Sequence, residues 1–259
     1  MTDASIKSRV AGGAAGDLYV WLAGVSVLIA FGLFAPTYWL QIPTGSFTGS
    51  PLLHLHGLLF SAWPLFFLSQ ALLAATGRIA NHRALGLLGI SLATAMLFSG
   101  FATAIHAMAD GIAAGHGASA RAFAIVPISA VVLFAGLVAA AIISVGRPET
   151  HKRLMLLATI SILQAPLDRI FFALNAGIAP GLRPGTVPPP PVEATIAGGL
   201  LTLVLVVVAI VYDWRSRGRV HVANLAGGAI IAGAIFLRAP LSATLAWDAI
   251  AAYLVRFAG

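Results

Sequence analysis

The chain of 259 residues has no cysteine and very little charge. The missing cysteines exclude disulfides, thiolate metal sites, thiol catalysis and covalent attachment of c-type haem. Only 9% of the residues are Asp, Glu, Lys or Arg, whereas a soluble domain carries about a quarter. Lys7 and Lys152 are the only lysines, so the last apolar segment offers no amine for a retinal Schiff base. The sequence also lacks HExxH, GxSxG, phosphate-loop and kinase signatures.

Long apolar runs stand where a soluble protein would carry charge. Hydrophobic residues make up 59% of the chain, and runs of about twenty recur along it, enough to cross a bilayer as helices. The sequence therefore predicts an all-α, polytopic membrane helical bundle that forms a single domain over residues 1–259. Seven spanning helices are expected, at about 17–39, 52–75, 82–109, 121–145, 152–175, 192–214 and 222–241.

Three segments are expected outside these spans. Residues 1–16 are predicted to be a cytoplasmic amino-terminal segment. Residues 176–191 are predicted to be an external loop, because the prolines from Pro188 to Pro191 lack the backbone donors that a helix needs. The tail after residue 241 either extends the seventh helix or lies along the membrane interface.

Lysine and arginine are distributed unevenly between the two sets of connections. One set holds ten of these residues and the other holds three, and basic residues gather on the cytoplasmic side of membrane proteins. This bias predicts a protein of the bacterial cytoplasmic (inner) membrane, with its amino terminus inside and its carboxyl terminus outside. The net charge of +7 is then explained by loops that face anionic lipid. The expected partner is the lipid bilayer, not a nucleic acid.

A basic, histidine-bearing motif recurs where three cytoplasmic connections lead into a helix. A Gly-Arg pair precedes His82, His151 and His221, which are 69 and 70 residues apart. A bundle can bring these histidines together, because all three begin odd-numbered helices, and Asp213 is nearby in sequence. Neutral imidazoles with a carboxylate suit Zn²⁺, Fe or Cu, and two imidazoles can instead ligate a haem iron. Alternatively, each histidine caps its helix or contacts lipid headgroups.

A second group of histidines is expected near the outer face. His54 and His56 point roughly 200° apart on a helix, so one of them faces the bundle. Gly57 allows close approach of a neighbouring helix or of a flat macrocycle. Pairing of His54 or His56 with His106 would form a second metal or b-type haem site. The alternative is a polar hydrogen bond between helices.

Two arginines, Arg169 and Arg238, fall inside predicted spans and are again 69 residues apart. Charged side chains within a bilayer are costly, so we expect both to face the interior of the bundle. They suit an anionic or polar ligand, such as haem propionates, a lipid headgroup or a quinone oxygen, or else they form structural ion pairs or extend to the interface. The shared spacing also suggests an internal repeat of two helices.

The chain resembles a family of uncharacterised bacterial multi-pass membrane proteins with HxHG, HRxLG, HKRLM and GRxHP elements. These elements stand here as 54–57, 82–86, 151–155 and 218–221, and they are spread over most of the chain. The sequence departs from the family at Val222, where the family usually has proline. The chain also resembles cytochrome b561-like bundles, in that histidines occur near both membrane faces. That resemblance implies b-type haem and electron transfer.

Three functions follow as hypotheses. The first is a membrane redox protein that binds b-type haem or another histidine-ligated metal and exchanges electrons with a quinone or another membrane protein. The second is a zinc-dependent membrane hydrolase, similar in outline to the adiponectin-receptor and alkaline-ceramidase group, although the HxxxH of that group's seventh helix is absent. The third is a non-catalytic assembly factor or carrier whose histidines serve structure.

Overall fold

The computed structural model describes residues 3–47, 49–176 and 188–258, and within them it contains helices and no strand. Seven of the segments described are long and apolar enough to cross a membrane. They are Leu18–Trp39, Pro51–Ala75, Ile79–Ala113, Gly117–Ile143, Pro148–Leu174, Val192–Arg217 and Val222–Ser242. The predicted all-α polytopic bundle is therefore confirmed, and each span lies close to its expected range.

Several spans are built from more than one helical segment. The helices described are α1 (Asp3–Phe34), α2 (Pro51–Ala75), α3 (Ile79–Ala113), α4 (Gly117–Phe123), α5 (Ile125–Ile143), α6 (Pro148–Ile162), α7 (Gln164–Ala176), α8 (Ile196–Arg217), α9 (Val222–Ser242) and α10 (Leu245–Leu254). Short π and 3₁₀ turns follow α1, precede α8 and follow α10, at Ala35–Trp39, Val192–Thr195 and Val255–Phe257. Helix α1 starts well before residue 17, so much of the expected leading segment is helical. Residues 177–187 of the expected proline-rich loop lie outside the described residues.

Proline explains where two of the spans are interrupted. The breaks between α4 and α5 and between α6 and α7 fall at Ala124 and Leu163, and Pro127 and Pro166 follow them by three residues. A proline has no N–H to bond the carbonyl four residues earlier, and its ring crowds that carbonyl. The interruption in the fifth span leaves Gln164 at the start of α7, inside the bundle.

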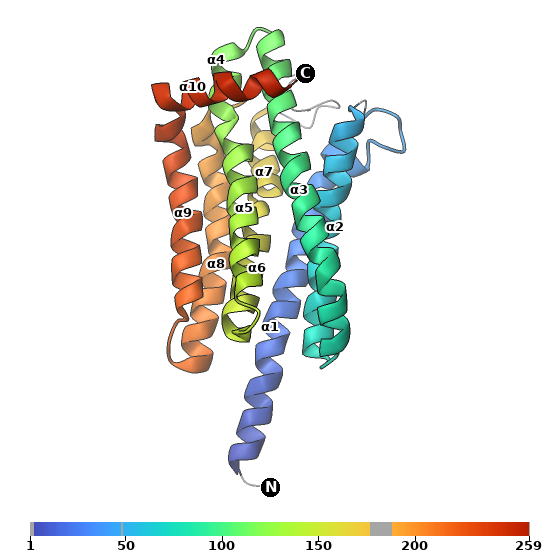
Figure 1. Cartoon of the computed structure of the whole chain (residues 1–259), viewed down its shortest axis with the longest axis vertical. Helices are drawn as coiled ribbons and strands as arrows, with labels where there is room; N and C mark the ends of the chain where they lie inside the picture. The colour runs from blue at the N-terminus through green and yellow to red at the C-terminus, as the bar shows by residue number, and fades with distance from the viewer. Residues whose placement is uncertain (1–2, 48, 177–187, 259) are drawn as a thin grey trace.

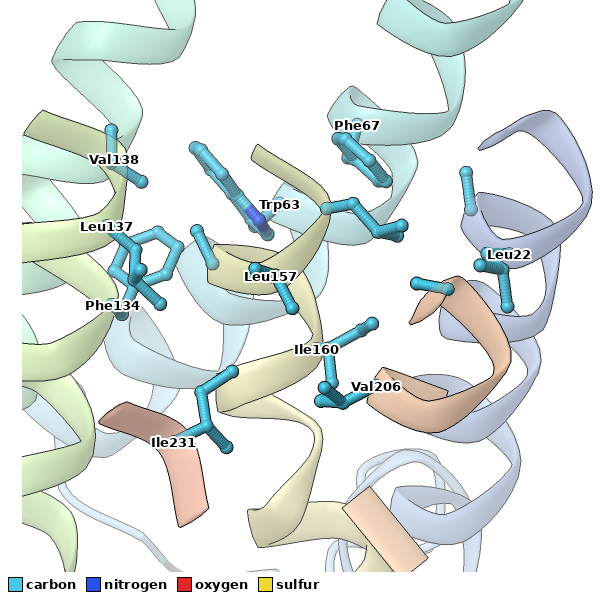
Figure 2. Close-up of a cluster of buried hydrophobic side chains, with 14 of the residues drawn as sticks. Leu22, Trp63, Phe67, Phe134, Leu137, Val138, Leu157, Ile160, Val206 and Ile231 are labelled. Atoms are coloured by element: carbon cyan, nitrogen blue, oxygen red, sulfur yellow. The ribbon is translucent and has the colours of Figure 1, made fainter. Parts of the chain in front are cut away.

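The fifth span forms the centre of the bundle. In its most apolar window 61% of the residues are buried, against 44% or less in the other six spans. Figure 2 shows the core around it, where side chains from α1, α2, α5, α8 and α9 meet those of α6. Trp63 of α2 is fully buried, packs edge-on against Phe134, and donates its indole N–H to Thr159 Oγ1 at 3.1 Å. This hydrogen bond fixes the register of α2 against α6.

The chain ends in a separate helix that lies across one end of the bundle. In Figure 1, α10 runs roughly at right angles to the spans beside α4, at the end opposite to the amino terminus. Thr244 caps α10 by accepting from the backbone N–H of Trp247. Asp248 pairs with Arg121 Nε at 2.6 Å, and the Trp247 indole donates to Arg121 O at 2.8 Å. The tail therefore does not continue α9 as one helix but forms a separate transverse helix.

Candidate functional site

The histidine end of the bundle, defined by His82, His151 and His221, is the end that carries the starts of α3, α6 and α9. His82 and His151 are each the fourth residue of their helices. Their rings contact each other with centroids 6.4 Å apart and planes at 86°. The structure therefore brings together two of the three corner histidines that the sequence singled out.

Both rings are held by backbone carbonyls. His151 Nδ1 lies 2.9 Å from Ala141 O, and His82 Nδ1 lies 3.3 Å from Gln70 O. A carbonyl oxygen only accepts, so Nδ1 is the donor in each ring, and the lone pair of the neutral imidazole remains on Nε2. Metal-binding histidines in proteins have this arrangement, in which the bond at Nδ1 fixes the ring and its tautomer.

Gln70 adds a third polar side chain at the same level. The residue is only 7% exposed, and both atoms of its amide lack a hydrogen-bond partner. Gln70 lies seven residues along α2 from Trp63, about 10 Å nearer the histidine end. His151 lies eight residues along α6 from Thr159, about 12 Å nearer the same end. Because Trp63 and Thr159 are bonded, Gln70 is level with His151. A buried amide without partners is costly unless a ligand or water satisfies it.

Asp213 belongs to an ion-pair network beside the histidine pair. Its two oxygens accept from Arg153, with Nε to Oδ2 at 2.8 Å and a second contact from Nη2 to Oδ1, and both side chains are 1% exposed. Oδ2 also accepts from Asn224 Nδ2 at 2.8 Å and from the backbone N–H of His221 at 3.2 Å. Glu149 extends the network by accepting from Arg153, from Lys152 and from Arg217.

His221 caps a helix. Its Nδ1 accepts from the backbone N–H of Ala223 at 3.1 Å, at the start of α9. The four residues expected to form one metal site thus fall into two groups, His82 with His151 and His221 with Asp213. In the described part of the chain, no group of three or more His, Asp or Glu side chains is arranged to hold a metal ion.

The cap makes stability depend on pH through His221. Burial first, and then the charge of Arg153, lower the pKa of His221 below its ordinary value, although Asp213 and Glu149 oppose this shift. A group with a lowered basic pKa contributes stability that is complete above about pH 6.5 and is lost as the pH falls through the folded pKa. Protonation also removes the Nδ1 lone pair that accepts from Ala223.

We therefore expect the thermal midpoint of His221→Asn to fall less than that of the wild type between pH 8 and pH 5. Asparagine caps helices at any pH in this range. His106→Asn, which changes an exposed histidine elsewhere, is the control and should follow the wild type. Equal acid sensitivity of His221→Asn and the wild type would contradict this account of the cap.

The histidines of the other end are not joined in the same way. His54 Nδ1 lies 3.2 Å from the Tyr38 hydroxyl, and its ring contacts Phe47 edge-on. The ring of His56 stacks on Phe60 with centroids 4.1 Å apart, and its buried Nδ1 has no partner. His106 is exposed and donates from Nδ1 to Ala102 O of its own helix. Among the described residues, no hydrogen bond or ring contact joins His106 to His54 or His56.

Arg238 is the centre of a second buried polar cluster. The residue is 3% exposed and donates from Nε to Ser129 Oγ at 2.7 Å and from Nη1 to Gln164 Oε1 at 2.6 Å. Gln164 in turn donates to Thr195 O at 2.9 Å. The nearby Asp168 is 4% exposed, and its Oδ1 has no partner. Arg238 therefore faces the bundle interior as expected. Its hydrogen-bond partners among the described residues, Ser129 and Gln164, are uncharged.

Arg169 follows Asp168 on α7 and contacts α1. Its guanidinium stands over the ring of Phe34, 5.3 Å from the centroid, which is a cation–π contact with the end of α1.

Sequence reasoning missed Gln70, Gln164 and Ser129, although a glutamine inside a long apolar run is itself a signal, because an amide is expensive to bury without a role.

Comparison of the chain with protein-family models, with curated proteins and with solved structures gave no match. The class of protein therefore rests on the fold: a multi-pass, all-α membrane protein whose spans suit a lipid bilayer. Within that class, unpartnered buried side-chain atoms lie beside the half-buried His82–His151 pair, in Gln70, and beside Arg238, in Asp168.

Proposed function

We propose that this protein lies in the bacterial inner membrane, with its amino terminus and histidine end on the cytoplasmic side, and binds a transition metal ion through His82 and His151. The observation that carries the proposal is the ring contact at 6.4 Å between two imidazoles whose Nδ1 atoms are both held by carbonyls. Imidazole nitrogen is a ligand for Zn, Cu and Fe.

The spacing of the rings supports a shared ion. Two imidazoles on opposite sides of one metal place their centroids about 6 Å apart, because a metal–nitrogen bond is about 2.0–2.1 Å and the ring centre lies about 1.1 Å beyond the nitrogen, whereas tetrahedral zinc would bring them to about 5 Å. The observed 6.4 Å agrees with that separation. The unpartnered amide of Gln70, at the same level, could ligate the ion through its oxygen or bond a metal-bound water.

The identity of the ion decides the role. Iron or copper, or the iron of a b-type haem, would let the site exchange electrons with a quinone or another membrane protein. Zinc would instead stabilise the contact between α3 and α6. A hydrolytic site that uses Asp213 is less favoured by the geometry, because Arg153, Asn224 and the His221 backbone already occupy the carboxylate.

Elemental analysis and an absorption spectrum of the purified protein test this proposal. We expect about one transition metal ion per chain, and a loss of at least tenfold in affinity for added Zn²⁺, Cu⁺ or Fe²⁺ in His82→Ala and in His151→Ala. His106→Ala and His221→Asn should bind as the wild type does. A Soret band lost in the same two variants would identify the metal as haem iron.

Two results would overturn the proposal. One is a wild-type protein that binds none of these ions and no haem. The other is wild-type metal content in His82→Ala and His151→Ala. Gln70→Leu adds a finer test: a metal affinity that falls with the fold intact places the amide at the site, whereas an unchanged affinity leaves the two histidines as its protein ligands.

A further inference from the structure

An apolar groove runs along α8 beside the start of the first span. Its volume is about 470 Å³, and its walls are Leu18 of α1 and four valines of α8, with Tyr212, Arg215 and Ser216 at one end. The valines are Val204, Val207, Val208 and Val211. They recur at intervals of three and four residues, so they line a single face of α8. The groove is therefore a strip of apolar surface that ends in polar side chains.

The polar end of the groove carries a cation without a counter-ion. Arg215 is exposed, and within the described residues it forms no ion pair. Three neighbouring cations differ in this respect, because Lys152 and Arg217 pair with Glu149 and Arg153 pairs with Asp213, whereas Arg219, like Arg215, forms no ion pair among the described residues. An anionic group at this end would meet a charge that no described residue of the protein neutralises.

The length of the groove indicates its depth in the membrane. From Val204 to Arg215 is eleven residues of helix, or about 16 Å. The hydrocarbon core of a bilayer is about 30 Å thick, so the apolar strip covers about one leaflet. Arg215 then lies where that leaflet's headgroups begin. A ligand with one apolar chain and an anionic head would place its chain against the valines and its head on Arg215.

We propose that the groove between α1 and α8 binds one anionic phospholipid, with an acyl chain along the four valines and its phosphate on Arg215. Basic sites between helices on the cytoplasmic side commonly hold anionic headgroups. The bound lipid would cover the lateral face of α8 next to the Glu149 network. This proposal does not depend on the metal site and extends to a different part of the molecule.

Native mass spectrometry and thermal shifts of the delipidated protein test it. The probes are vesicles or micelles of phosphatidylglycerol and of phosphatidylcholine. We expect one phosphatidylglycerol per chain, bound in preference to phosphatidylcholine. Arg215→Ala should weaken phosphatidylglycerol binding about fivefold, since a basic residue near an anionic headgroup contributes about 1 kcal/mol.

Two variants make the test specific. Arg219→Ala removes the same charge from the same end without lining the groove, so it should bind phosphatidylglycerol as the wild type does. Val207→Trp fills the apolar strip at an exposed position and should remove lipid binding while leaving Arg215 in place.

Several outcomes would overturn the proposal. Equal losses in Arg215→Ala and Arg219→Ala would mean a diffuse basic surface. Equal binding of the two lipids would mean an ordinary lipid shell. Competition by inorganic phosphate at the affinity of the lipid would mean that the site binds free phosphate. Unchanged lipid binding in Val207→Trp would mean that the lipid does not occupy the groove.

Discussion

Replacing Asp213 by asparagine is expected to lower the free energy of unfolding by about 3 kcal/mol, because it leaves a buried guanidinium without its main counter-ion. Arg153 is 1% exposed. Every described partner of the Asp213 carboxylate is a donor: Arg153, Asn224 and the His221 backbone. Asparagine offers one oxygen and an NH₂ group, so at least one donor would face another donor. Glu149 remains beside Arg153 and limits the loss.

Thermal unfolding of the purified protein measures this effect. A loss of 3 kcal/mol corresponds to a fall of about 6–12 °C in the midpoint for a chain of this size. Asp248→Asn is the matched control, because its pair with Arg121 is much more exposed, at 29% and 52%. Pairs of that kind contribute about 0–1 kcal/mol.

The double variant Arg153→Met with Asp213→Leu separates charge from packing. Replacing both members of a buried ion pair by apolar side chains of similar volume is often neutral. We expect it to recover much of the stability that Asp213→Asn loses. If Asp213→Asn unfolded at the same temperature as Asp248→Asn, the buried ion pair would contribute no more to the free energy of unfolding than the exposed one.

Replacing Gly198 by alanine is expected to be nearly as damaging. A Cβ atom at this position would lie 2.0 Å from Asp168 Oδ1 and 2.9 Å from the Asp168 backbone nitrogen. The second contact is with backbone, so α7 and α8 must move apart. Overpacking of this kind costs about 1–3 kcal/mol, and we expect the upper end of that range because the spacing of the Arg238 cluster is disturbed as well.

Gly233→Ala is the control for helix propensity. Gly233 is inside α9, and nothing lies within 4 Å of a Cβ added there. Alanine should raise the midpoint slightly at this position, because glycine is a poorer helix former by about 1 kcal/mol. Adding Asp168→Ala to Gly198→Ala should restore part of the stability, since it removes the nearer of the two clashes. If Gly198→Ala and Gly233→Ala had equal midpoints, α7 and α8 would not be packed as described.

The spans and the end at which the histidines lie follow from the sequence because both depend on local quantities. The apolar length of each run sets a crossing, and alternate crossings return the chain to the same end. The contact of His82 with His151 was one of the expected pairings. It needs only two helices that begin at the same level close to each other.

The partners of the charged residues could not be predicted in this way. From the sequence alone Arg153 is expected among the cations of a cytoplasmic connection, because it follows Lys152 in a basic corner. On a helix neighbouring side chains diverge by about 100°, so Lys152 stands over the Tyr19 ring while Arg153 turns toward Asp213. The distance of 60 residues between Arg153 and Asp213 is a property of how the spans pack, which the sequence pattern does not specify.

The same limit applies to the cluster of Arg238. Its depth in a span indicated an interior position, but Ser129 is 109 residues away and Gln164 is 74 residues away. Gln164 reaches the cluster because the fifth span is interrupted next to it, and the cause, Pro166, is visible in the sequence. The pattern predicts such a break but not which neighbours the break will face.

The transverse helix α10 packs against one end of the bundle and is synthesised after the seven spans. Its contacts with Arg121 join residues that are more than 120 positions apart, and Trp247 and Asp248 follow all seven described spans along the chain. Proteins are synthesised from the amino terminus, so all seven spans are complete before Trp247 and Asp248 emerge. A chain that stops after Ser242 would therefore have every crossing in place and still leave that end of α4 uncovered. The cover over α4 is therefore synthesised after the crossings and not with them.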